Sequence, residues 1–357
     1  MFTIPMNSIT FDVAIIGAGA SGLTCAQQLQ KAGYSVIVLD KSRGVGGRMA
    51  TRRVSGSRAD HGVRYLEPKG ELLIQLIEQL KTCEPLENQL QLWTNKLYEF
   101  KENQLQSQVI DQPYYIIPSG MSTVGKFLTN GLNLQLNSKV ESLTITPEKI
   151  WKCQIQSTNS NTLEPPILAK SLVIAIPAPQ ALMLLEAANT EVELNFLDII
   201  KSVEYDPCLT VIAGYSKEKY QELPTWKAVR FCDDQILDWV GVDSSKRLNA
   251  TQPVFVIQSN AQFAEQYLEE TDLTLAGQQL IHQAANTILP GWETPEWIQI
   301  HRWRYGFCRQ PLSLSCLATT TPLPLVCAGD WCSGNHLEAA LKSGLETAKW
   351  LQTQIKL

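Results

Sequence analysis

The chain of 357 residues is long enough for two domains, or for one large domain with an insertion. Hydrophobic residues make up 44% of it and charged residues 18%, which is typical of a globular protein with a large buried core. The formal net charge of −5 and the lack of a basic run argue against a general nucleic-acid-binding protein.

The nine cysteines are scattered, with neither CxxC pairs nor zinc-finger spacing. This pattern predicts reduced, mostly buried thiols and no metal centre. The N-terminal sequence MFTIPMNSIT lacks the basic start and the apolar core of a signal peptide. No uncharged apolar stretch approaches the ~18 residues that span a bilayer. We therefore expect a soluble, cytoplasmic protein without a membrane span.

A glycine motif follows the first predicted strand, Val13 to Ile16, and opens a predicted helix from Ser21 to Ala32. In the motif GAGASG, Gly17 permits a sharp turn and Gly19 lets a pyrophosphate approach the backbone. Gly22 lets the helix pack closely on the strand. The phosphates are expected at the helix N-terminus, where unpaired N–H groups favour negative charge.

A second predicted strand, Ser35 to Leu39, ends at Asp40, where an acidic side chain can accept hydrogen bonds from a ribose. The order of strand, glycine turn, helix, strand and acid indicates dinucleotide binding. The alternative interpretation is an ordinary βαβ unit.

The loop after Asp40 carries two adjacent glycines and several arginines. Gly46 and Gly47 allow the backbone to lie against a planar or phosphorylated ligand, and Arg43 and Arg48 can neutralise phosphates. A solvated basic surface loop would explain the arginines but not the paired glycines.

Together these motifs resemble the FAD-binding N-terminus of the amine-oxidase superfamily, which includes monoamine oxidases, phytoene desaturases and renalases. The sequence KSRGVGGRMATRR followed by ADHGVRY is similar to the renalase-like branch. Cys308 and Cys332 lack the S-G-G-C-Y surroundings of a covalent flavin attachment, so noncovalent FAD is expected. The resemblance implies the following FAD-binding residues: Gly17, Gly19, Ala20, Ser21, Gly22, Asp40, Lys41, Arg43, Gly47, Arg48, Met49, Asp60, His61, Gly62, Val140, Gly329, Asp330 and Leu337.

The middle of the chain shows weaker patterns. Apolar spacing predicts a helix over 71–81, whereas residues 84–112 are rich in Gln, Glu and Asn and show little periodicity. Further predicted elements are a short strand at 114–118, a helix from 119 to 129, a pair of strands at 134–137 and 140–145, strands at 151–156 and 172–176, and a helix from 177 to 185.

Residues 186–310 show a different pattern of predicted elements. Antiparallel strands are predicted at 208–215, 227–231, 237–242 and 253–258, and helices at 261–268 and 273–289. We therefore predict an α/β fold, α+β overall: a Rossmann-type FAD-binding domain with an inserted substrate domain whose sheet is mixed or antiparallel. The FAD-binding domain is expected to comprise residues 1–70, 131–185 and 311–357. The substrate domain is expected to comprise a helical part, 71–130, and a sheet part, 186–310.

The predicted strand Ile298 to Tyr305 places His301, Trp303 and Tyr305 on one face and two arginines, Arg302 and Arg304, on the other. The aromatic face could wall a cavity for a flat substrate, or it could be core packing beside snorkelling arginines. The similarity of H-R-W-R-Y to a renalase-like motif favours the cavity.

The C-terminal segment begins with a strand, Leu325 to Ala328, which leads to Gly329 and Asp330. A helix from Leu337 to Gln354 follows. The resemblance implies that Asp330 binds the ribityl or pyrophosphate region and that the helix N-terminus faces the flavin, where it can stabilise negative charge. The candidate catalytic residues are His301, Trp303, Tyr305 and His336.

Two departures from the family pattern bear on substrate. Arg64 stands where the family has Gln, and the last helix begins H-L-E-A-A-L rather than R-V-E-G-A-W. We expect Arg64, Arg302 or Arg304 to help receive an anionic ligand.

The resemblance implies an FAD-dependent oxidoreductase that takes a hydride at flavin N5 from a small reduced substrate. In the renalase-like case this substrate is a dihydropyridine isomer of NAD(P)H, and O2 is the acceptor that becomes hydrogen peroxide. Alternatives are an amine oxidase, a desaturase acting on an apolar substrate, and a non-catalytic FAD-binding redox sensor. A simple NAD-dependent dehydrogenase does not account for Arg43 to Arg48 or for Asp330.

Overall fold

The computed structural model describes residues 10–83, 90–188 and 192–355. The chain divides into two compact units. The first unit comprises residues 1–47, 124–204 and 308–357, and the second comprises residues 48–123 and 205–307.

The first unit contains a sheet with the strand order β16-β17-β10-β1-β2-β7, to which β9 and β8 add beside β10. β1 pairs in parallel with β10 and with β2, and β10 pairs in parallel with β17, whereas β9 and β16 add antiparallel at β10 and β17. This parallel βαβ arrangement confirms the predicted Rossmann-type fold. The strands are β1 (Thr10–Ile16), β2 (Val36–Leu39), β7 (Leu134–Gln135), β8 (Ser138–Ile145), β9 (Trp151–Ser157), β10 (Leu163–Ile174), β16 (Leu317–Thr319) and β17 (Leu325–Cys327).

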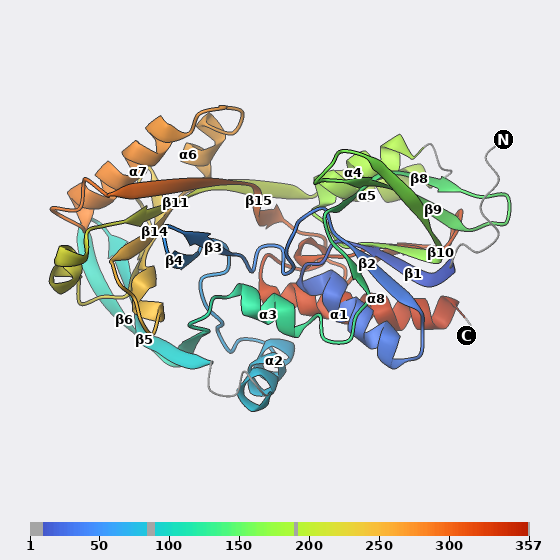
Figure 1. Ribbon diagram of the computed structural model, residues 1–357, viewed down its shortest axis with the longest axis horizontal. Helices are drawn as coiled ribbons and strands as arrows, with labels where there is room; N and C mark the ends of the chain where they lie inside the picture. Colours follow the sequence, from blue (N-terminus) through green and yellow to red (C-terminus); the bar gives the residue numbers. More distant parts are fainter. Residues whose placement is uncertain (1–9, 84–89, 189–191, 356–357) are drawn as a thin grey trace. The chain divides into compact units, whose positions relative to one another are not determined.

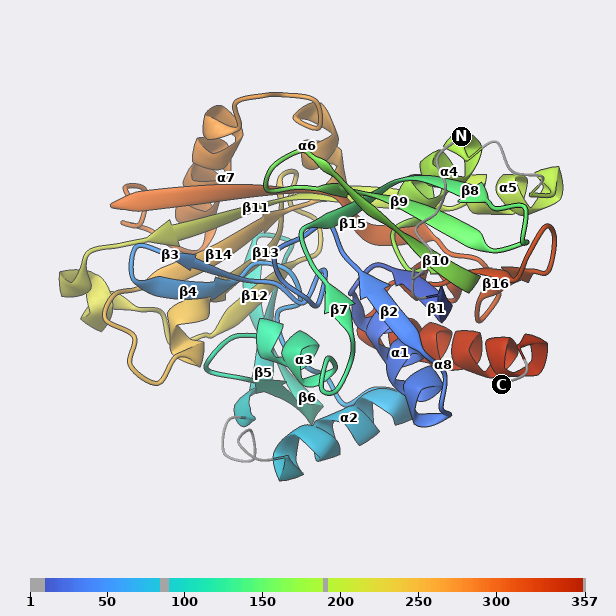
Figure 2. The same ribbon diagram turned by 45° about the vertical axis from the view of Figure 1, so that its right-hand side comes forward.

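Two helices of the first unit, α1 (Ala20–Lys31) and α8 (Leu337–Gln354), lie side by side against this sheet (Figures 1 and 2). A Cβ atom on Gly344 would lie 2.3 Å from the carbonyl oxygen of Ser21, so the two helices can approach this closely only with a glycine there. The prediction for the last helix is confirmed at both ends. The remaining elements around this sheet are α3 (Ser122–Phe127), α4 (Ala178–Ala187), α5 (Leu194–Lys201) and the 3₁₀ turn η3 (Asp330–Cys332).

The second unit contains a seven-stranded sheet with the order β15-β11-β14-β13-β12-β5-β6. The pairs β11–β14, β14–β13, β13–β12 and β5–β6 are antiparallel and the pair β12–β5 is parallel, which confirms the predicted mixed sheet. In Figure 1, α6 (Ala261–Gln266) and α7 (Thr274–Thr287) lie on one side of β11 and β15. The other elements are α2 (Glu71–Thr82), β5 (Gln91–Lys101), β6 (Gln104–Ile116), β11 (Glu204–Gly214), β12 (Ala228–Phe231), β13 (Leu237–Val242), β14 (Val254–Ser259), β15 (Trp297–Gln310) and the turns η1 (Lys217–Glu222) and η2 (Asp243–Lys246).

The segment after α2 corrects one prediction. Within residues 71–130, which were expected to be helical, β5 and β6 form a long hairpin; of the stretch 84–112, residues 84–89 lie outside the described part. The buried side chains of β5 are Trp93, Leu97 and Phe100, and the spacing of three between Leu97 and Phe100 departs from strict alternation. Trp93 and Leu97 share one face of the strand and one hydrophobic cluster, whereas Phe100 belongs to a second cluster on the other face. Because both faces of β5 are partly buried, the sequence shows no single alternating pattern.

The predicted strand pair 134–137 and 140–145 is also wrong in its pairing. Strand β7 pairs in parallel with β2, and β8 pairs antiparallel with β9. Between them the chain turns at Asn137, whose φ is +56°. A left-handed residue of this kind redirects the chain, and Asn tolerates it better than most residues.

A two-stranded hairpin in the second unit, β3 (Thr51–Val54) with β4 (Ser57–Asp60), was not predicted. Its two-residue loop, Ser55 and Gly56, has positive φ angles of 47° and 75°, as a type I′ turn requires. The pairing continues past the strands, since the N–H of His61 donates to the carbonyl oxygen of Ala50.

Within the described residues, every helix is either too short or too polar to cross a bilayer. Six of the nine cysteines are buried.

Candidate functional site

The glycine turn of the first unit is shaped by close backbone approaches. Gly17 has a φ of +110°, and a Cβ atom there would lie 2.4 Å from the carbonyl oxygen of Ala175. A Cβ atom on Gly22 would lie 2.1 Å from the carbonyl oxygen of Gly17. The sequence GAGASG therefore permits a turn that residues with side chains would block.

Gly19 differs from these two glycines, because no described atom lies within 4 Å of a Cβ built on it. Gly19 is the N-cap of α1, and no side chain caps the helix there. The buried hydroxyl of Ser21, in the first turn, has no hydrogen-bond partner among the described residues. Open space beside uncapped N–H groups at a helix N-terminus fits the pyrophosphate of a dinucleotide.

The second glycine loop meets the first. The N–H of Gly46 donates to the carbonyl oxygen of Ala18 at 2.8 Å, and a Cβ atom on Gly47 would lie 3.5 Å from the Cα of Gly19. Gly47 has a φ of +55°. The loop that resembles the FAD-binding pattern thus lies against the turn itself, while Lys41 and Arg43 are exposed.

Asp40 follows β2 and ties these two loops together. Its carboxylate accepts hydrogen bonds from the N–H groups of Ala18 and Ser42, each at 2.7 Å. An ionised carboxylate offers about four acceptor positions, so two bonds to the backbone leave capacity for ribose hydroxyls.

The predicted site residues of the C-terminal segment, Gly329, Asp330, His336 and Leu337, all belong to the first unit. The N–H of Gly329 donates to the hydroxyl of Ser343 at 3.0 Å, and Asp330 is buried. His336 caps α8, because its Nδ1 accepts a hydrogen bond from the N–H of Ala339 at 3.3 Å. Leu337 is the first residue of that helix. His336 therefore belongs to a different unit from the other three catalytic candidates.

The predicted FAD-binding residue Val140 is buried in β8, where it pairs with Ile155.

The segment that begins the second unit is held by its own backbone. Arg48 donates from Nη1 to the carbonyl oxygen of Gly306, and its own carbonyl oxygen accepts from the N–H of Val63 at 2.8 Å. A Cβ atom on Gly62 would clash with the carbonyl oxygen of Arg48. Met49 is buried beside them. The predicted residues Arg48, Met49 and Gly62 therefore share one tightly packed loop.

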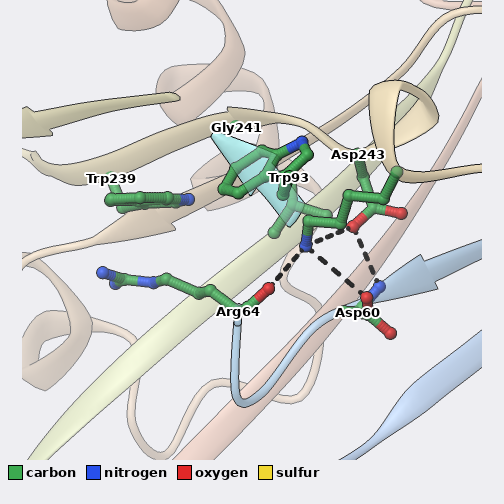
Figure 3. Close-up of a pocket in the computed structure, with 8 residues that line it drawn as sticks. Asp60, Arg64, Trp93, Trp239, Gly241 and Asp243 are labelled. Carbon is green, nitrogen blue, oxygen red and sulfur yellow. Dashed lines mark hydrogen bonds and ion pairs between the residues drawn. The ribbon is translucent and has the colours of Figure 1, made fainter. Parts of the chain in front are cut away.

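Asp60 stands at the centre of a buried charge network (Figure 3). Its side chain accepts hydrogen bonds from the Thr51 hydroxyl at 2.7 Å and from the N–H of Met121 at 2.9 Å. It also pairs with Arg247 at 2.8 Å and with Lys246 at 3.5 Å. These contacts use both carboxylate oxygens.

Asp243 completes this network, at 2.6 Å from Arg247 and 2.9 Å from Lys246. Burial alone would raise the pKa of Asp243, but the charges of Arg247 and Lys246 lower it below the ordinary value. The Lys246 ammonium also donates to the carbonyl oxygen of Arg64 at 2.8 Å. Two acids and two bases thus balance in charge and fix the chain on both sides of His61.

The cavity beside this network is small. It is lined by Asp60, Arg64, Trp93, Trp239, Gly241, Asp243, Lys246 and Val256, and its volume is about 10 Å³ (Figure 3). A cavity of that size holds at most about one water molecule. The network is therefore a structural support and not a substrate-binding cavity.

His61 projects from this support into an aromatic cluster. Its ring meets that of His301 edge to face, with centroids 4.9 Å apart, and stacks on Trp303 at 5.3 Å. The rings of His301 and Trp303 are 4.2 Å apart, and the Trp303 indole donates to the carbonyl oxygen of His61 at 2.9 Å. His301 and Trp303 therefore share one face of β15, as predicted. Both contact His61, which directly follows β4.

Both histidines are neutral at neutral pH. Burial, with the nearby His301 and Arg52, lowers the pKa of His61 to about 3. Burial and Arg52 lower the pKa of His301 to about 4. His61 is only 5% exposed, and its Nδ1 has no hydrogen-bond partner among the described residues. A neutral imidazole nitrogen of this kind can accept or donate one hydrogen bond to a ligand.

Tyr305 lies further along β15, where its ring meets Tyr205 at 5.5 Å rather than the histidines. The predicted opposite face of β15 is confirmed: Arg302 donates to the carbonyl oxygens of Tyr267, Leu268 and Glu270. Arg304 pairs with Glu269.

Arg64, the third arginine that was expected to receive an anion, does not lie on β15. It donates to Gln258 at 2.5 Å and to Asp238 at 2.7 Å, and its guanidinium lies over the Trp239 ring at 4.4 Å. All three arginines that were expected to receive an anion therefore already have protein partners.

Comparison with known proteins identifies the class of this chain. The family of flavin containing amine oxidoreductases matches residues 82–351, and the NAD(P)-binding Rossmann-like domain matches residues 15–80. The first match covers more than half of the chain. The chain therefore belongs to the flavin-containing amine oxidoreductase family, and FAD is its expected cofactor.

The individual relatives are similar over shorter stretches. Putrescine oxidase of Kocuria rosea is 36% identical over 74 residues, which cover 21% of this chain and 16% of that protein. Phytoene desaturase of Fusarium fujikuroi is 40% identical over 61 residues, which cover 17% of this chain and 11% of that protein. These matches span less than a fifth of either relative.

The similarity of fold extends further. The structure of putrescine oxidase bound to putrescine superposes with a TM-score of 0.71 at 14% sequence identity. The superposition covers 97% of this chain and 100% of that one. At this low identity the likeness concerns the fold alone.

Proposed function

We propose that this protein is an FAD-dependent oxidase of small reduced molecules, with a renalase-like preference for dihydropyridine isomers of NAD(P)H. The observation that supports this proposal is the pair of neutral, buried histidines, His61 and His301, which lie against Trp303. A flat heterocyclic donor suits such a cluster, because aromatic rings offer stacking and the unpartnered Nδ1 of His61 offers a hydrogen bond.

The residues of the chain have separate tasks in this proposal. The glycine turn and Asp40 hold FAD noncovalently in the first unit, with no nucleophile supplied by the protein. His61, His301 and Trp303 bind and orient the donor in the second unit. The Asp60 network keeps His61 in place through its neighbouring backbone, so the binding cluster is preorganised before a ligand arrives.

The proposed reaction breaks one C–H bond of the donor. FAD, when bound, supplies an acceptor for the hydride at N5, and both electrons then pass to O2. The donor becomes the aromatic pyridinium cation. In balance, one donor molecule, one proton and one O2 give one oxidised donor and one H2O2. Because His61 and His301 are neutral, they leave the positive charge of the product unstabilised and so favour its release.

A second candidate is amine oxidation. The family match and the similarity to putrescine oxidase favour it, since that enzyme's structure holds putrescine. An amine donor carries positive charge in solution, whereas the dihydropyridine isomers of NAD(P)H carry phosphates. The two candidates therefore differ in the charge of the substrate.

Anaerobic mixing tests both candidates together. The purified protein is mixed with the 2- and 6-dihydro isomers of NAD(P), and separately with putrescine, while the visible flavin absorbance is followed. We expect rapid bleaching by the dihydropyridines, then recovery of colour and release of one H2O2 per turnover when oxygen is admitted. Bleaching by putrescine alone would replace the first proposal with the second. A flavin that only dithionite reduces would contradict both.

A further inference from the structure

One face of the β3–β4 hairpin gathers residues toward the histidine cluster. Arg52 pairs with Ala59 in the hairpin, and the N–H of His61 donates to the carbonyl oxygen of Ala50 in the same register. Side chains opposite each other across an antiparallel pair, and those two residues further along, share a face. Arg52, Ala59 and His61 therefore lie on one face, whereas Arg53 and Asp60 lie on the other.

This face of the hairpin packs toward β15. Val54 and Ala59 share a hydrophobic cluster with Trp297, the first residue of β15. Trp297 lies on the same face of its strand as Gln299, His301 and Trp303. The hairpin face that carries Arg52 and His61 and the strand face that carries His301 are thus turned toward each other, as the ring contact between the two histidines also requires.

The polar atoms along this junction lack partners. Among the described residues, Nε of Arg52, Nδ1 of His61 and Oε1 of Gln299 are all buried without a hydrogen bond. Arg52 also makes no ion pair within the described part of the chain. Arg52 is half-buried, its Nε is buried, and its guanidinium has neither an acid nor a hydrogen-bond acceptor among the described residues, so its donors are available to an anionic ligand.

We propose that Arg52 is the anion-recognising residue of the donor site, and that the substrate carries a carboxylate or phosphate beside its heterocyclic ring. Its guanidinium presents a planar fork of N–H donors that matches either anion, while the neutral His61 and His301 bind the uncharged part of the ligand. This inference rests on the proposed function and names the charge class of its substrate.

The electrostatics of the cluster agree with this assignment. Arg52 contributes to lowering the pKa of both histidines, so its charge reaches their rings. With both histidines neutral, Arg52 leaves the site with a net positive charge, which opposes a cationic amine and attracts an anion. Arg64, Arg302 and Arg304 cannot take this role without giving up their protein partners.

The test measures binding to the FAD-loaded protein without turnover, by isothermal titration calorimetry. The probes are nicotinate, which carries a carboxylate, and nicotinamide, its neutral counterpart. Nicotinamide mononucleotide is the phosphate-bearing probe. We expect one of the two anions to bind at least about tenfold more tightly than nicotinamide, since a charge-assisted hydrogen bond is worth that much or more. Which anion binds more tightly identifies the carboxylate or the phosphate.

The variants assign this preference to one residue. Arg52→Gln should abolish it and leave nicotinamide binding unchanged. Arg53→Gln is the matched control, because Arg53 is the next residue of β3, is exposed and faces the other way. Arg52→Lys should keep part of the preference, and it decides the matter if Arg52→Gln does not fold.

The inference is overturned if neither anion is preferred by the wild-type protein, if Arg52→Gln or Arg52→Lys keeps the full preference, or if Arg53→Gln loses it equally. Because binding is read without electron transfer, an Arg52-dependent preference would stand even if no dihydropyridine reduced the flavin. Reduction that is independent of Arg52 would uphold the proposed function and remove this inference.

Discussion

His61 and His301 meet edge to face in the second unit, with their ring centroids 4.9 Å apart. Two imidazoles at this separation cannot both carry a proton without strong repulsion, and Arg52 adds to the positive potential. The pair is therefore held neutral by its surroundings. This neutrality determines both how the protein responds to acid and which ligands the cluster can bind.

Acid should destabilise the protein through these histidines. Their folded-state pKa values, about 3 and about 4, lie below the ordinary value near 6.5, so the unfolded chain binds protons that the folded chain does not. Their contribution to stability is complete above about pH 6.5, declines progressively as the pH falls below that value, and is fully lost once the pH has passed the folded-state values of about 4 and about 3. Each titrating histidine contributes a slope of up to roughly 1.4 kcal/mol per pH unit.

Urea denaturation between pH 7 and pH 4 measures this effect. The free energy of unfolding of His301→Gln should fall less steeply with pH than that of the wild type. His282→Gln is the control, since it removes an exposed histidine from α7. Equal pH dependence of His301→Gln and wild type would show that the pair does not control acid stability.

Gly19→Ala should separate cofactor binding from folding. No described atom lies within 4 Å of a Cβ at Gly19, so the apoprotein should fold with an unchanged melting temperature. The added methyl group would occupy the space in which a pyrophosphate approaches, and FAD affinity should fall at least about tenfold. Fluorescence titration of apoprotein with FAD measures this loss.

Gly44→Ala is the companion variant, because its Cβ position is equally open but lies outside the glycine turn. It should bind FAD nearly as well as the wild type. Equal affinities of Gly19→Ala and wild type would place the pyrophosphate elsewhere.

Asp243→Asn should destabilise the second unit strongly. Asp243 is 1% exposed in its side chain and pairs with both Lys246 and Arg247, so the change leaves buried positive charge uncompensated. Breaking a buried ion pair from one side costs about 3–5 kcal/mol. Chemical denaturation measures the loss. Glu204→Gln, which removes the partner of Arg309 in an exposed pair, should change stability little. A loss for Asp243→Asn no larger than for Glu204→Gln would contradict the structural role of this network.

Trp303→Phe should impair donor binding more than folding. The change keeps an aromatic ring against His61 and His301 but removes the indole N–H that donates to the carbonyl oxygen of His61. We expect a rise in KM for the donor of about tenfold with FAD content unchanged, because a single hydrogen bond that positions the site is lost. Steady-state peroxide production measures KM. An unchanged KM would remove Trp303 from the donor site.

The sequence predicted those features that are carried by local patterns. The strand, glycine turn and helix around Gly17 follow from small residues at fixed spacing, and the alternation at His301 and Trp303 follows from the period of a strand. The last helix was predicted at both ends because a cap residue and a continuous amphipathic pattern mark it.

Contacts between distant segments could not be predicted in this way. Asp60 lies more than 180 positions from Lys246 and Arg247, and nothing in either local sequence indicates their pairing. The same holds for Arg64, Arg302 and Arg304, whose protein partners come from other strands and loops. Arg52 was not predicted as an anion-binding residue, because its lack of a protein partner depends on the fold of the hairpin. The Ser55-Gly56 turn that forms this hairpin was not recognised in the sequence.

The most direct test of the account follows the hydride itself. The FAD-loaded protein is mixed anaerobically, in a stopped-flow instrument, with 6-dihydro-NAD carrying either hydrogen or deuterium at the carbon that donates. The account predicts complete flavin bleaching at a rate that deuterium lowers several-fold, because breaking this C–H bond is the proposed step. Flavin that stays oxidised with this donor and with the 2-dihydro isomer, while dithionite still reduces it, would contradict the account.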